Sequence, residues 1–433
     1  MVIRILRRHI IMICIGMLAV VIAVTMAVNC SRSQQISANS SSVRNTKNSS
    51  NSALPAEEVL PTQNTSSTSA ESKTEMRAVW VPYMSLNMSR DQDKSEQAFQ
   101  KKFAAIVKTA KSCGMNTLIV QVRPFGDALY PSAYFPWSHV VSGTQGNDPH
   151  YDPLKDMVTE THRAGMKIHA WVNPLRIQIS GTPAVLAVNS PCNQFRSNKA
   201  KADYVAAFNG GIYYNPAYAE VRKLVADGAQ EIVRKYEVDG LQFDDYFYPT
   251  QDAAFDKNAY SNYCETARKT GTPLSLGEWR KANINLLVSQ VYREIKTVKP
   301  SVPFGIAPQG NVQNDSNMGA DVCTWCSARG YIDYICPQLY YNFQNPTLPF
   351  DRAANTWKSL VKNENIKLYY GLAAYKAGSS ADSGTWKTSS TILASQVQYG
   401  RAQKCGGFMF YSCDYLTGAQ TKQEIESVVK LLN

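Results

Sequence analysis

The chain is predicted to be an α/β protein whose residues 75–433 fold as a (β/α)8 barrel, also called a TIM barrel. Three observations predict this fold. From residue 76 onward, short apolar or aromatic runs alternate with amphipathic stretches of helical period, which is the pattern of a parallel sheet covered by helices. These runs number eight, as in a closed barrel. They are apolar throughout, as parallel strands are when both of their faces are buried.

The predicted strands and helices follow one another in regular order. Strands are predicted at residues 76–83, 116–123, 166–173, 239–244, 303–307, 331–340, 367–374 and 405–411. Helices are predicted at residues 95–113, 153–164, 216–236, 279–298 and 392–404. Pro153 and Pro216 suit the first turn of a helix, and Gly114 and Gly165 suit the end of one. The alternative is an open doubly wound sheet, which is disfavoured because no glycine-rich phosphate loop follows the first strand.

The N-terminal region has the composition of an export signal or membrane anchor. Arg4, Arg7 and Arg8 precede an apolar run over residues 10–28, which is about long enough to span a bilayer. Because the basic residues come before the span, the N-terminus is expected to stay inside. Residues 1–30 are therefore predicted to be an uncleaved anchor that holds the rest of the chain in the cell envelope, outside the cytoplasm.

The segment after the anchor is polar and simple in composition. Residues 31–74 are dominated by Ser, Asn, Thr and Gln, and they carry too few apolar side chains to form a core. They are predicted to be a disordered tether. A lipoprotein with its lipid on Cys30 is the alternative to the uncleaved anchor, although Asn29 is unusual directly before an acylated cysteine.

The net charge and the numbers of His and Cys residues indicate which partners and cofactors to expect. The chain has 45 Lys and Arg against 34 Asp and Glu, a formal charge of +11. The basic residues are dispersed, so no nucleic-acid partner is expected, and the excess favours an anionic polymer outside the membrane. The five His form no partner set, and the Cys323–Cys326 pair has no second pair at zinc-site spacing. No metal and no cofactor are predicted.

Candidate site residues stand at the predicted carboxyl ends of the strands, where barrels of this class carry their active sites. These ends combine aromatic rings with amides, arginines and carboxylates, a mixture that suits a sugar-binding site. The candidates for substrate binding are Arg123, Asp127, Asn173, Arg176, Trp279, Gln338, Tyr340 and Tyr411. Arg123, Asn173, Arg176, Gln338 and Tyr340 are expected to converge in one pocket.

The strongest single signal is the pair Asp244 and Asp245 at the end of the fourth predicted strand. Adjacent carboxylates repel, so the pKa of one should rise while that of the other stays low. One proton donor and one charged stabiliser are what glycosidic cleavage requires. The structural alternative is that one of them caps a helix or pairs with Arg123 or Arg176.

The sequence resembles the glycosyl hydrolase-like family 10 domain of bacterial envelope proteins. The resemblance rests on Arg77-Ala78-Val79-Trp80-Val81, Gln121-Val122-Arg123-Pro124, Gly143-Thr144-Gln145-Gly146, Tyr151-Asp152-Pro153-Leu154, His169-Ala170-Trp171-Val172-Asn173-Pro174 and Asp244-Asp245-Tyr246-Phe247-Tyr248-Pro249. It implies a (β/α)8 barrel that cleaves peptidoglycan glycan strands, notably strands without their peptides.

Two departures from the family pattern fall near the expected site. Glu278-Trp279-Arg280-Lys281 stands where members usually have Asp-Trp-Arg-Arg, and Gln309-Gly310 replaces a Phe-Gly after the fifth strand. Both departures are expected to affect which substrate the protein prefers.

Two mechanisms are open at this level. In the first, the 2-acetamido group of the substrate is the nucleophile, one Asp orients it and the other protonates the leaving oxygen. In the second, one Asp works with a carboxylate of another strand, either Glu278 or Asp127. The predicted catalytic residues are therefore Asp244, Asp245 and Glu278. The alternative function is a non-catalytic barrel that binds wall glycan, and a polysaccharide deacetylase is disfavoured because it needs a metal triad.

Overall fold

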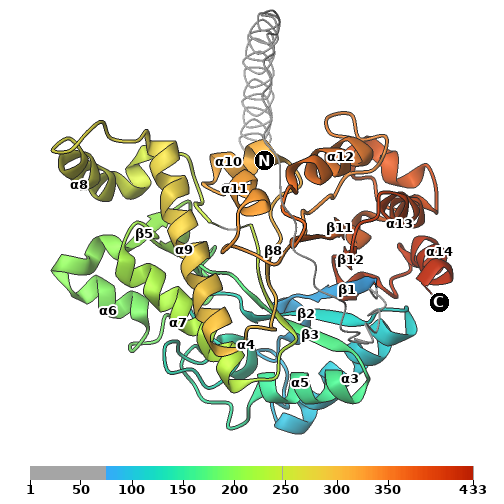
Figure 1. Ribbon diagram of the computed structural model, residues 1–433. Coiled ribbons are helices and arrows are strands. Elements are labelled where there is room, and N and C mark those ends of the chain that lie inside the picture. The colour runs from blue at the N-terminus through green and yellow to red at the C-terminus, as the bar shows by residue number, and fades with distance from the viewer. Residues whose placement is uncertain (1–74, 246, 433) are drawn as a thin grey trace, which may run out of the picture. The chain divides into compact units, whose positions relative to one another are not determined.

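The computed structural model describes residues 75–245 and 247–432 (Figure 1). The predicted anchor over residues 1–30 and tether over residues 31–74 lie outside the described residues. Between residues 75 and 432, none of the described helices combines the length and the apolar character needed to cross a bilayer.

The described chain forms a ring of parallel strands, which confirms the predicted (β/α)8 barrel. The strands are β1 (Met76–Val81), β2 (Thr117–Arg123), β3 (Lys167–Val172), β7 (Gly240–Phe243), β8 (Phe304–Ile306), β9 (Tyr334–Ile335), β10 (Lys367–Leu368), β11 (Tyr370–Leu372) and β12 (Gly407–Phe410). They pair in the order β10-β9-β8-β7-β3-β2-β1-β12-β11. β10 and β11 are two halves of the seventh strand, because β10 pairs with β9 while β11 pairs with β12. The backbone N–H of Gly371 donates to the carbonyl of Pro337 at 2.9 Å and joins the two ends of the ring.

The sixth strand is shorter than predicted. The prediction covered residues 331–340, but regular pairing is confined to Tyr334–Ile335, followed by single bridges from Gln338 to Gln309 and to Gly371. Pro337 lies between these stretches, and proline has no N–H with which to continue a ladder.

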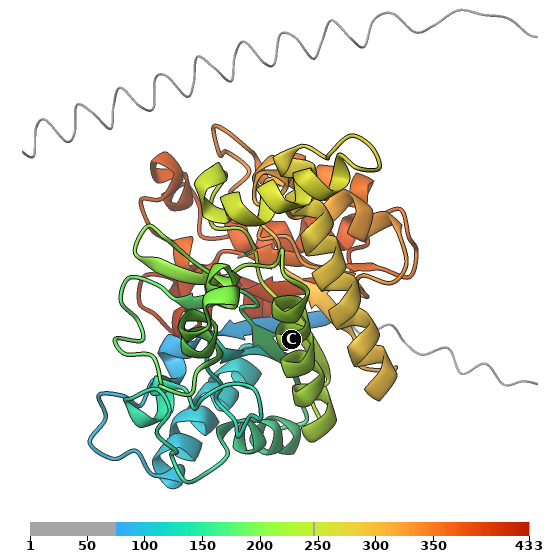
Figure 2. The same ribbon diagram turned by 90° about the vertical axis from the view of Figure 1, so that its left-hand side faces the viewer.

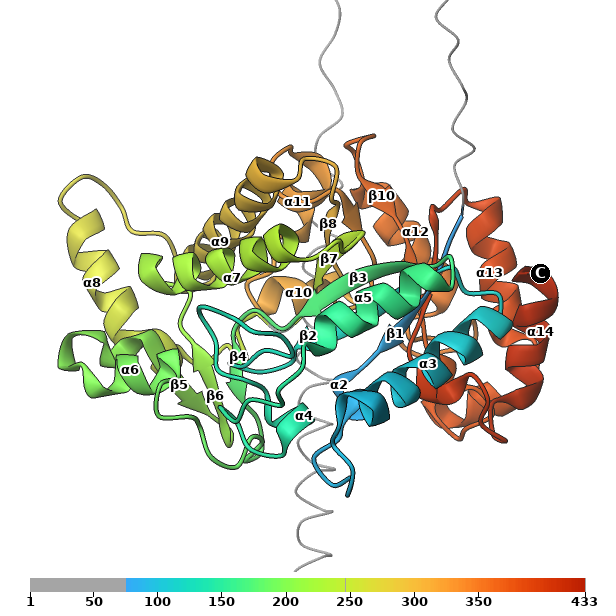
Figure 3. The same cartoon turned by 90° about the horizontal axis from the view of Figure 1, so that it is seen from below.

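Helices surround the strands, as the views in Figures 1 and 3 agree. The longer ones are α3 (Glu96–Ser112), α5 (Pro153–Arg163), α7 (Ala219–Lys235), α8 (Lys257–Ala267), α9 (Leu276–Val298), α12 (Phe350–Leu360), α13 (Ile392–Ala402) and α14 (Lys422–Leu432). The short ones are α2 (Tyr83–Leu86), α4 (His139–Ser142), α6 (Pro191–Ser197), α10 (Val312–Asn317) and α11 (Val322–Ser327). In Figure 2 the long helix α9, in gold, runs along the outside of the domain.

Most predicted helix ends are confirmed, but two starts are wrong, since α9 begins at Leu276 and not at the predicted residue 279. Pro153 is in the first turn of α5, where the Asp152 carboxylate accepts the N–H of Lys155 at 3.1 Å. Gly114 and Gly165 follow α3 and α5 with positive φ. Pro216 does not begin α7, which starts at Ala219.

The barrel interior holds large rings that two glycines make possible. A Cβ atom on Gly240 would lie 2.5 Å from the His169 ring, and one on Gly305 would lie 2.2 Å from the Tyr334 ring. His169 and Tyr334 are joined by a hydrogen bond of 3.1 Å between Nδ1 and the phenol oxygen, and the phenol donates to Gln242 at 3.3 Å. Burial lowers the pKa of His169 to about 4, so this interior imidazole is neutral.

An insertion between β3 and α7 adds a small antiparallel sheet that the strand pattern did not predict. It consists of β4 (Arg176–Gln178), β5 (Val205–Phe208) and β6 (Gly211–Tyr214) in the order β4-β6-β5, and it lies near α6 in Figure 3. Because β4 begins four residues after β3 ends, the insertion places Arg176 at the carboxyl end of the barrel.

Candidate active site

The centre of the site is a column of inward-facing side chains at the carboxyl ends of β2, β3 and β7. Side chains alternate along a strand, so every second residue faces the barrel axis. Trp171 belongs to the interior cluster, and Asn173 and Asp244 continue the inward face of their strands beyond it. The hydrogen bonds among these side chains confirm that they meet, as Trp171 Nε1 and Asn173 Nδ2 both donate to Oδ2 of Asp244.

Asp244 is held in a fixed orientation. Trp171 Nε1 lies 3.3 Å from its Oδ2 atom, and the side chain of Asp244 is buried. Asn173 is itself oriented, because its Oδ1 atom accepts from Gln121 Nε2 at 2.6 Å, and Gln121 accepts from the backbone N–H of Tyr83 at 2.9 Å. N–H groups aimed at one oxygen suit a carboxylate that acts as an acceptor.

Asp245 is partly exposed and turns toward the fifth and sixth strands. Its Oδ1 atom accepts from Gln338 Nε2 at 3.1 Å, and the side chain of Gln309 also donates to it. Burial among these groups raises the pKa of Asp245 above its ordinary value, although the hydrogen bond from Gln338 and the charge of Arg176 oppose the rise. The two adjacent aspartates therefore differ in their surroundings.

Arg176 closes the site from the insertion. Its Nε atom donates to the carbonyl of Pro124 at 2.8 Å, and its guanidinium lies 5.0 Å from the centre of the Phe125 ring. Fixed in this way, it brings a positive charge to the side of Asp245.

Tyrosines from the last three strands form the opposite wall. The rings of Tyr340, Tyr375 and Tyr411 lie 5.7 to 6.0 Å apart, and Trp80 lies 6.1 Å from Tyr411. Burial, followed by the charge of Asp244, raises the pKa of Tyr411 to about 12, so its phenol stays protonated and can donate. Aromatic rings beside carboxylates offer both stacking and hydrogen bonding to a sugar.

Arg123 is not in this wall, and the prediction that it joins the pocket is wrong. A β-bulge between Gln121 and Arg123 interrupts the alternation of β2, so the side chain turns away from the axis toward α7. The guanidinium is 1% exposed and lies 4.3 Å from the Phe135 ring centre, and a Cβ atom on Gly228 of α7 would lie 2.4 Å from it. Gln121 occupies the inward position instead.

Asp127 is placed beneath the loop after β2, where it is fully buried. One oxygen lies 3.3 Å from His139 Nδ1 and accepts from Gln145 Nε2 at 3.1 Å. These contacts hold the loop together, so the structure does not support Asp127 as a substrate-binding residue.

Glu278 and Trp279 are also apart from the aspartates. Glu278 is 61% exposed in the first turn of α9 and pairs with Lys281 at 3.0 Å. Trp279 is buried against Tyr260 and Tyr263 of α8, at ring distances of 5.2 and 5.7 Å. The Glu278 contact is an i, i+3 pair within α9, whereas the Trp279 contacts join α9 to α8. The described hydrogen bonds around Asp244 and Asp245 include neither residue.

Five residues near the site were not among the predicted site residues. They are Gln121, Trp171, Gln309, Asp315 and Tyr375. Alternation along β3 could have indicated Trp171, because it precedes Asn173 by two positions on the same face. Asp315 follows β8 by nine positions, in α10, and no spacing rule connects it with the strand ends.

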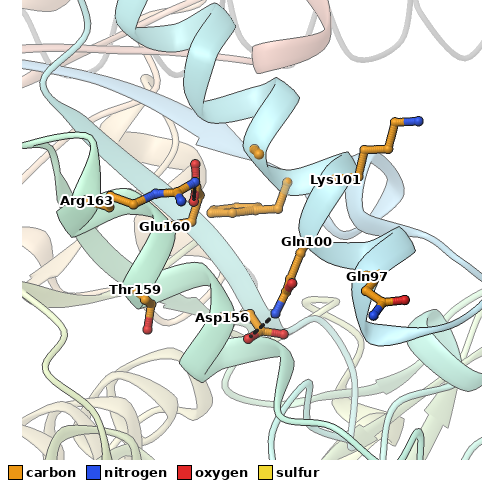
Figure 4. A pocket seen from close by; sticks show the side chains of 9 residues that line it. Gln97, Gln100, Lys101, Asp156, Thr159, Glu160 and Arg163 are labelled. Atoms are coloured by element: carbon orange, nitrogen blue, oxygen red, sulfur yellow. Dashed lines mark hydrogen bonds and ion pairs between the residues drawn. The ribbon is translucent and has the colours of Figure 1, made fainter.

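The groove drawn in Figure 4 lies elsewhere, between α3 and α5 in the helical layer. It has a volume of about 470 Å³, and a 3.1 Å hydrogen bond joins Gln100 to Asp156 within it. Because it lies between two helices of the outer layer, it is separate from the strand ends. Within the described range, His, Cys, Asp and Glu side chains form no group of three that could hold a metal ion.

Two solved structures have a fold similar to that of the domain. The domain is similar to the glycoside hydrolase domain of PgaB (BpsB) from Bordetella bronchiseptica, with a TM-score of 0.54 and 12% identity over 83% of this chain and 99% of that one. It is equally similar to the catalytic domain of a β-amylase from Paenibacillus polymyxa, at a TM-score of 0.54 and 11% identity over 83% and 98% of the two chains. At such identities the likeness concerns the barrel fold alone, and this is the fold of the barrel glycoside hydrolases.

The family follows from the sequence. The model of the family described as "Glycosyl hydrolase-like 10" matches residues 75–387, and the chain belongs to this family of glycoside hydrolases. It is 34% identical to the glycosyl hydrolase YngK of Bacillus subtilis (strain 168) over 72% of this chain and 63% of that protein, which is less than two thirds of its length. It is 32% identical to the glycosyl hydrolase DigH of Escherichia coli (strain K12) over 81% of this chain and 84% of that protein.

Proposed function

We propose that this protein hydrolyses the glycosidic bonds of peptidoglycan glycan strands that have lost their peptides. The observation that carries the proposal is the pair Asp244 and Asp245, held in different surroundings beside an aromatic wall. The charge of +11 fits such a polymer, because muramic acid without its peptide exposes a carboxylate. The family and its relatives give the reaction class.

Asp245 is the proposed proton donor. Its raised pKa favours the protonated form that general-acid catalysis needs. In the first step its O–H protonates the glycosidic oxygen while the bond from that oxygen to the anomeric carbon breaks. In the second step the Asp245 carboxylate takes a proton from water while the water oxygen attacks the anomeric carbon and the bond from that carbon to the acetamide oxygen breaks. This step restores the carboxylic acid and the acetamide.

Asp244 is the proposed partner of the 2-acetamido group. As the anomeric bond breaks, the acetamide carbonyl oxygen attacks that carbon and forms a cyclic oxazolinium, and the ionised Asp244 accepts its N–H and offsets its positive charge. Tyr411, close to Asp244, is a donor available to the substrate. Substrate assistance is favoured over two-carboxylate hydrolysis because Glu278 is exposed and ion-paired, and Asp127 is buried under a loop.

Incubation of residues 75–433 with several glycans tests the proposal. Peptide-free peptidoglycan strands, intact peptidoglycan and chitin oligomers would be supplied separately, and products read by mass spectrometry. We expect cleavage of the peptide-free strands at a higher kcat/KM than of the other two. Binding of the strands without any product would instead support the non-catalytic glycan-binding barrel.

We also propose that residues 1–30 anchor the protein in the membrane and residues 31–74 tether the domain in the cell envelope, because of the basic, apolar and polar composition of these segments. Limited proteolysis of the full chain in membranes is expected to release a stable domain that begins near residue 75. A protease-resistant fragment that retains residues 35–70 would contradict the tether.

A further inference from the structure

A buried carboxyl group lies near Asp245 and has no part in the mechanism above. Asp315 of α10 is 1% exposed, and its Oδ1 atom accepts the backbone N–H of Gln309 at 2.9 Å. Its Oδ2 atom is buried and has no hydrogen-bond partner among the described residues. Such an oxygen is costly to bury, so local packing alone does not explain an aspartate here.

Gln309 connects Asp315 with Asp245. The backbone of Gln309 bridges to Gln338, and each of these two glutamines donates a side-chain hydrogen bond to Asp245. The amide oxygen of Gln309 is held in turn by Asn314 Nδ2 at 3.0 Å. α10 therefore fixes both the backbone and the side chain of Gln309.

We propose that Asp315 is a positioning residue for the reaction, which holds Gln309 in place so that Gln309 and Gln338 orient the Asp245 carboxyl. The inference rests on the proposed role of Asp245 as proton donor. It also gives a reason for Gln309-Gly310 at a place where the family pattern has Phe-Gly, because phenylalanine has no side-chain donor for a carboxylate.

Charged and titratable groups face Asp245 from four elements. They are Asp244 at the end of β7, Arg176 of β4, Tyr340 beyond β9 and Asp315 of α10. Burial and then the charge of Asp245 raise the pKa of Asp315 well above its ordinary value. Because the charge of Asp245 raises the pKa of Asp315, Asp245 ionises first, and Asp315 is uncharged while Asp245 loses its proton.

Asp315→Ala is the central test. The variant removes the oxygen that accepts the Gln309 N–H, so Gln309 is held less well beside Asp245. We expect kcat to fall by roughly tenfold and the alkaline limb of the kcat/KM profile to move to higher pH, because a donated hydrogen bond lowers the pKa of a carboxyl group. Asp315→Asn keeps an oxygen that can accept this N–H, so it should recover most of the lost kcat.

Gln309→Leu tests the same connection from the partly exposed side of the site, and it does not alter the buried carboxyl. It removes a donor to Asp245, so the alkaline limb is expected to move to higher pH, as in Asp315→Ala. Shifts in the same direction from two residues, with recovery of kcat in Asp315→Asn, would not result from a general loss of stability.

Glu424→Gln is the matched control. Glu424 is a buried carboxyl that accepts the backbone N–H groups of Ile392 and Leu393, both at 2.9 Å, at the start of α13. Its replacement should leave the pH profile unchanged, and thermal unfolding would be measured for every variant. The inference is overturned if Asp315→Ala and Gln309→Leu both have the wild-type kcat and pH profile while Asp245→Asn is inactive, an outcome that leaves the proposed function intact. Full activity of Asp245→Asn would instead show that Asp245 is not the proton donor, and the proposed function would then need another donor.

Discussion

Asp245→Asn is expected to lower kcat on peptide-free strands by about 10²–10⁴-fold, the usual contribution of general acid–base catalysis. The variant keeps the shape of the side chain but has no acidic proton. The hydrogen-bonded glutamines and the aromatic wall remain, so KM should change far less than kcat. Activity would be measured together with thermal unfolding, with Asp252→Asn as a control at an exposed helix cap.

The role of Asp245 as proton donor also predicts the direction in which activity changes with pH. The proton donor must be protonated, so wild-type kcat/KM should fall as the pH rises through the pKa of Asp245, which burial places above the ordinary value of 3.8. Asp245→Asn should lose this alkaline limb. A leaving group that departs without protonation, such as a nitrophenolate, should recover most of the lost rate. If the deficit were as large with nitrophenolate as with the natural strand, Asp245 would not be the donor.

The barrel could be predicted because its signal is repeated along the chain. Eight apolar runs separated by helical stretches leave little choice of architecture, and glycines such as Gly165 mark helix ends by a conformation that other residues adopt poorly. The aspartate pair could be predicted because strand ends converge in this fold, so adjacency in the sequence becomes position at the barrel mouth.

The remaining site residues depend on irregularities that sequence periodicity does not encode. A single extra residue in β2 turns Arg123 out of the site and leaves Gln121 in its place. Glu278 and Trp279 were predicted from their nearness to a family motif, yet the helical geometry of α9 turns them toward Lys281 and α8. Asp315 lies near the site because the loop after β8 folds back toward Gln309, and tertiary contacts determine the conformation of such a loop.

Asp244→Asn is expected to lower kcat by about 10²–10³-fold, the effect of removing one preorganised electrostatic stabiliser. Its signature should differ from that of Asp245→Asn. A nitrophenolate leaving group should not recover the loss, because the missing charge acts on the acetamide and not on the leaving oxygen.

The substrate itself provides the decisive comparison for Asp244. If the acetamide is the nucleophile, strands from which the N-acetyl groups have been removed should bind the wild-type protein yet resist cleavage, and on these strands Asp244→Asn should show no further loss. Wild-type cleavage of de-N-acetylated strands at the normal rate would exclude substrate assistance. Asp244 also accepts from Trp171 and Asn173, so the variant places an amide where two N–H donors point. A loss of activity that follows a comparable loss of thermal stability would show that Asp244 holds the strand end together, because an electrostatic role in the reaction leaves the unfolding temperature nearly unchanged.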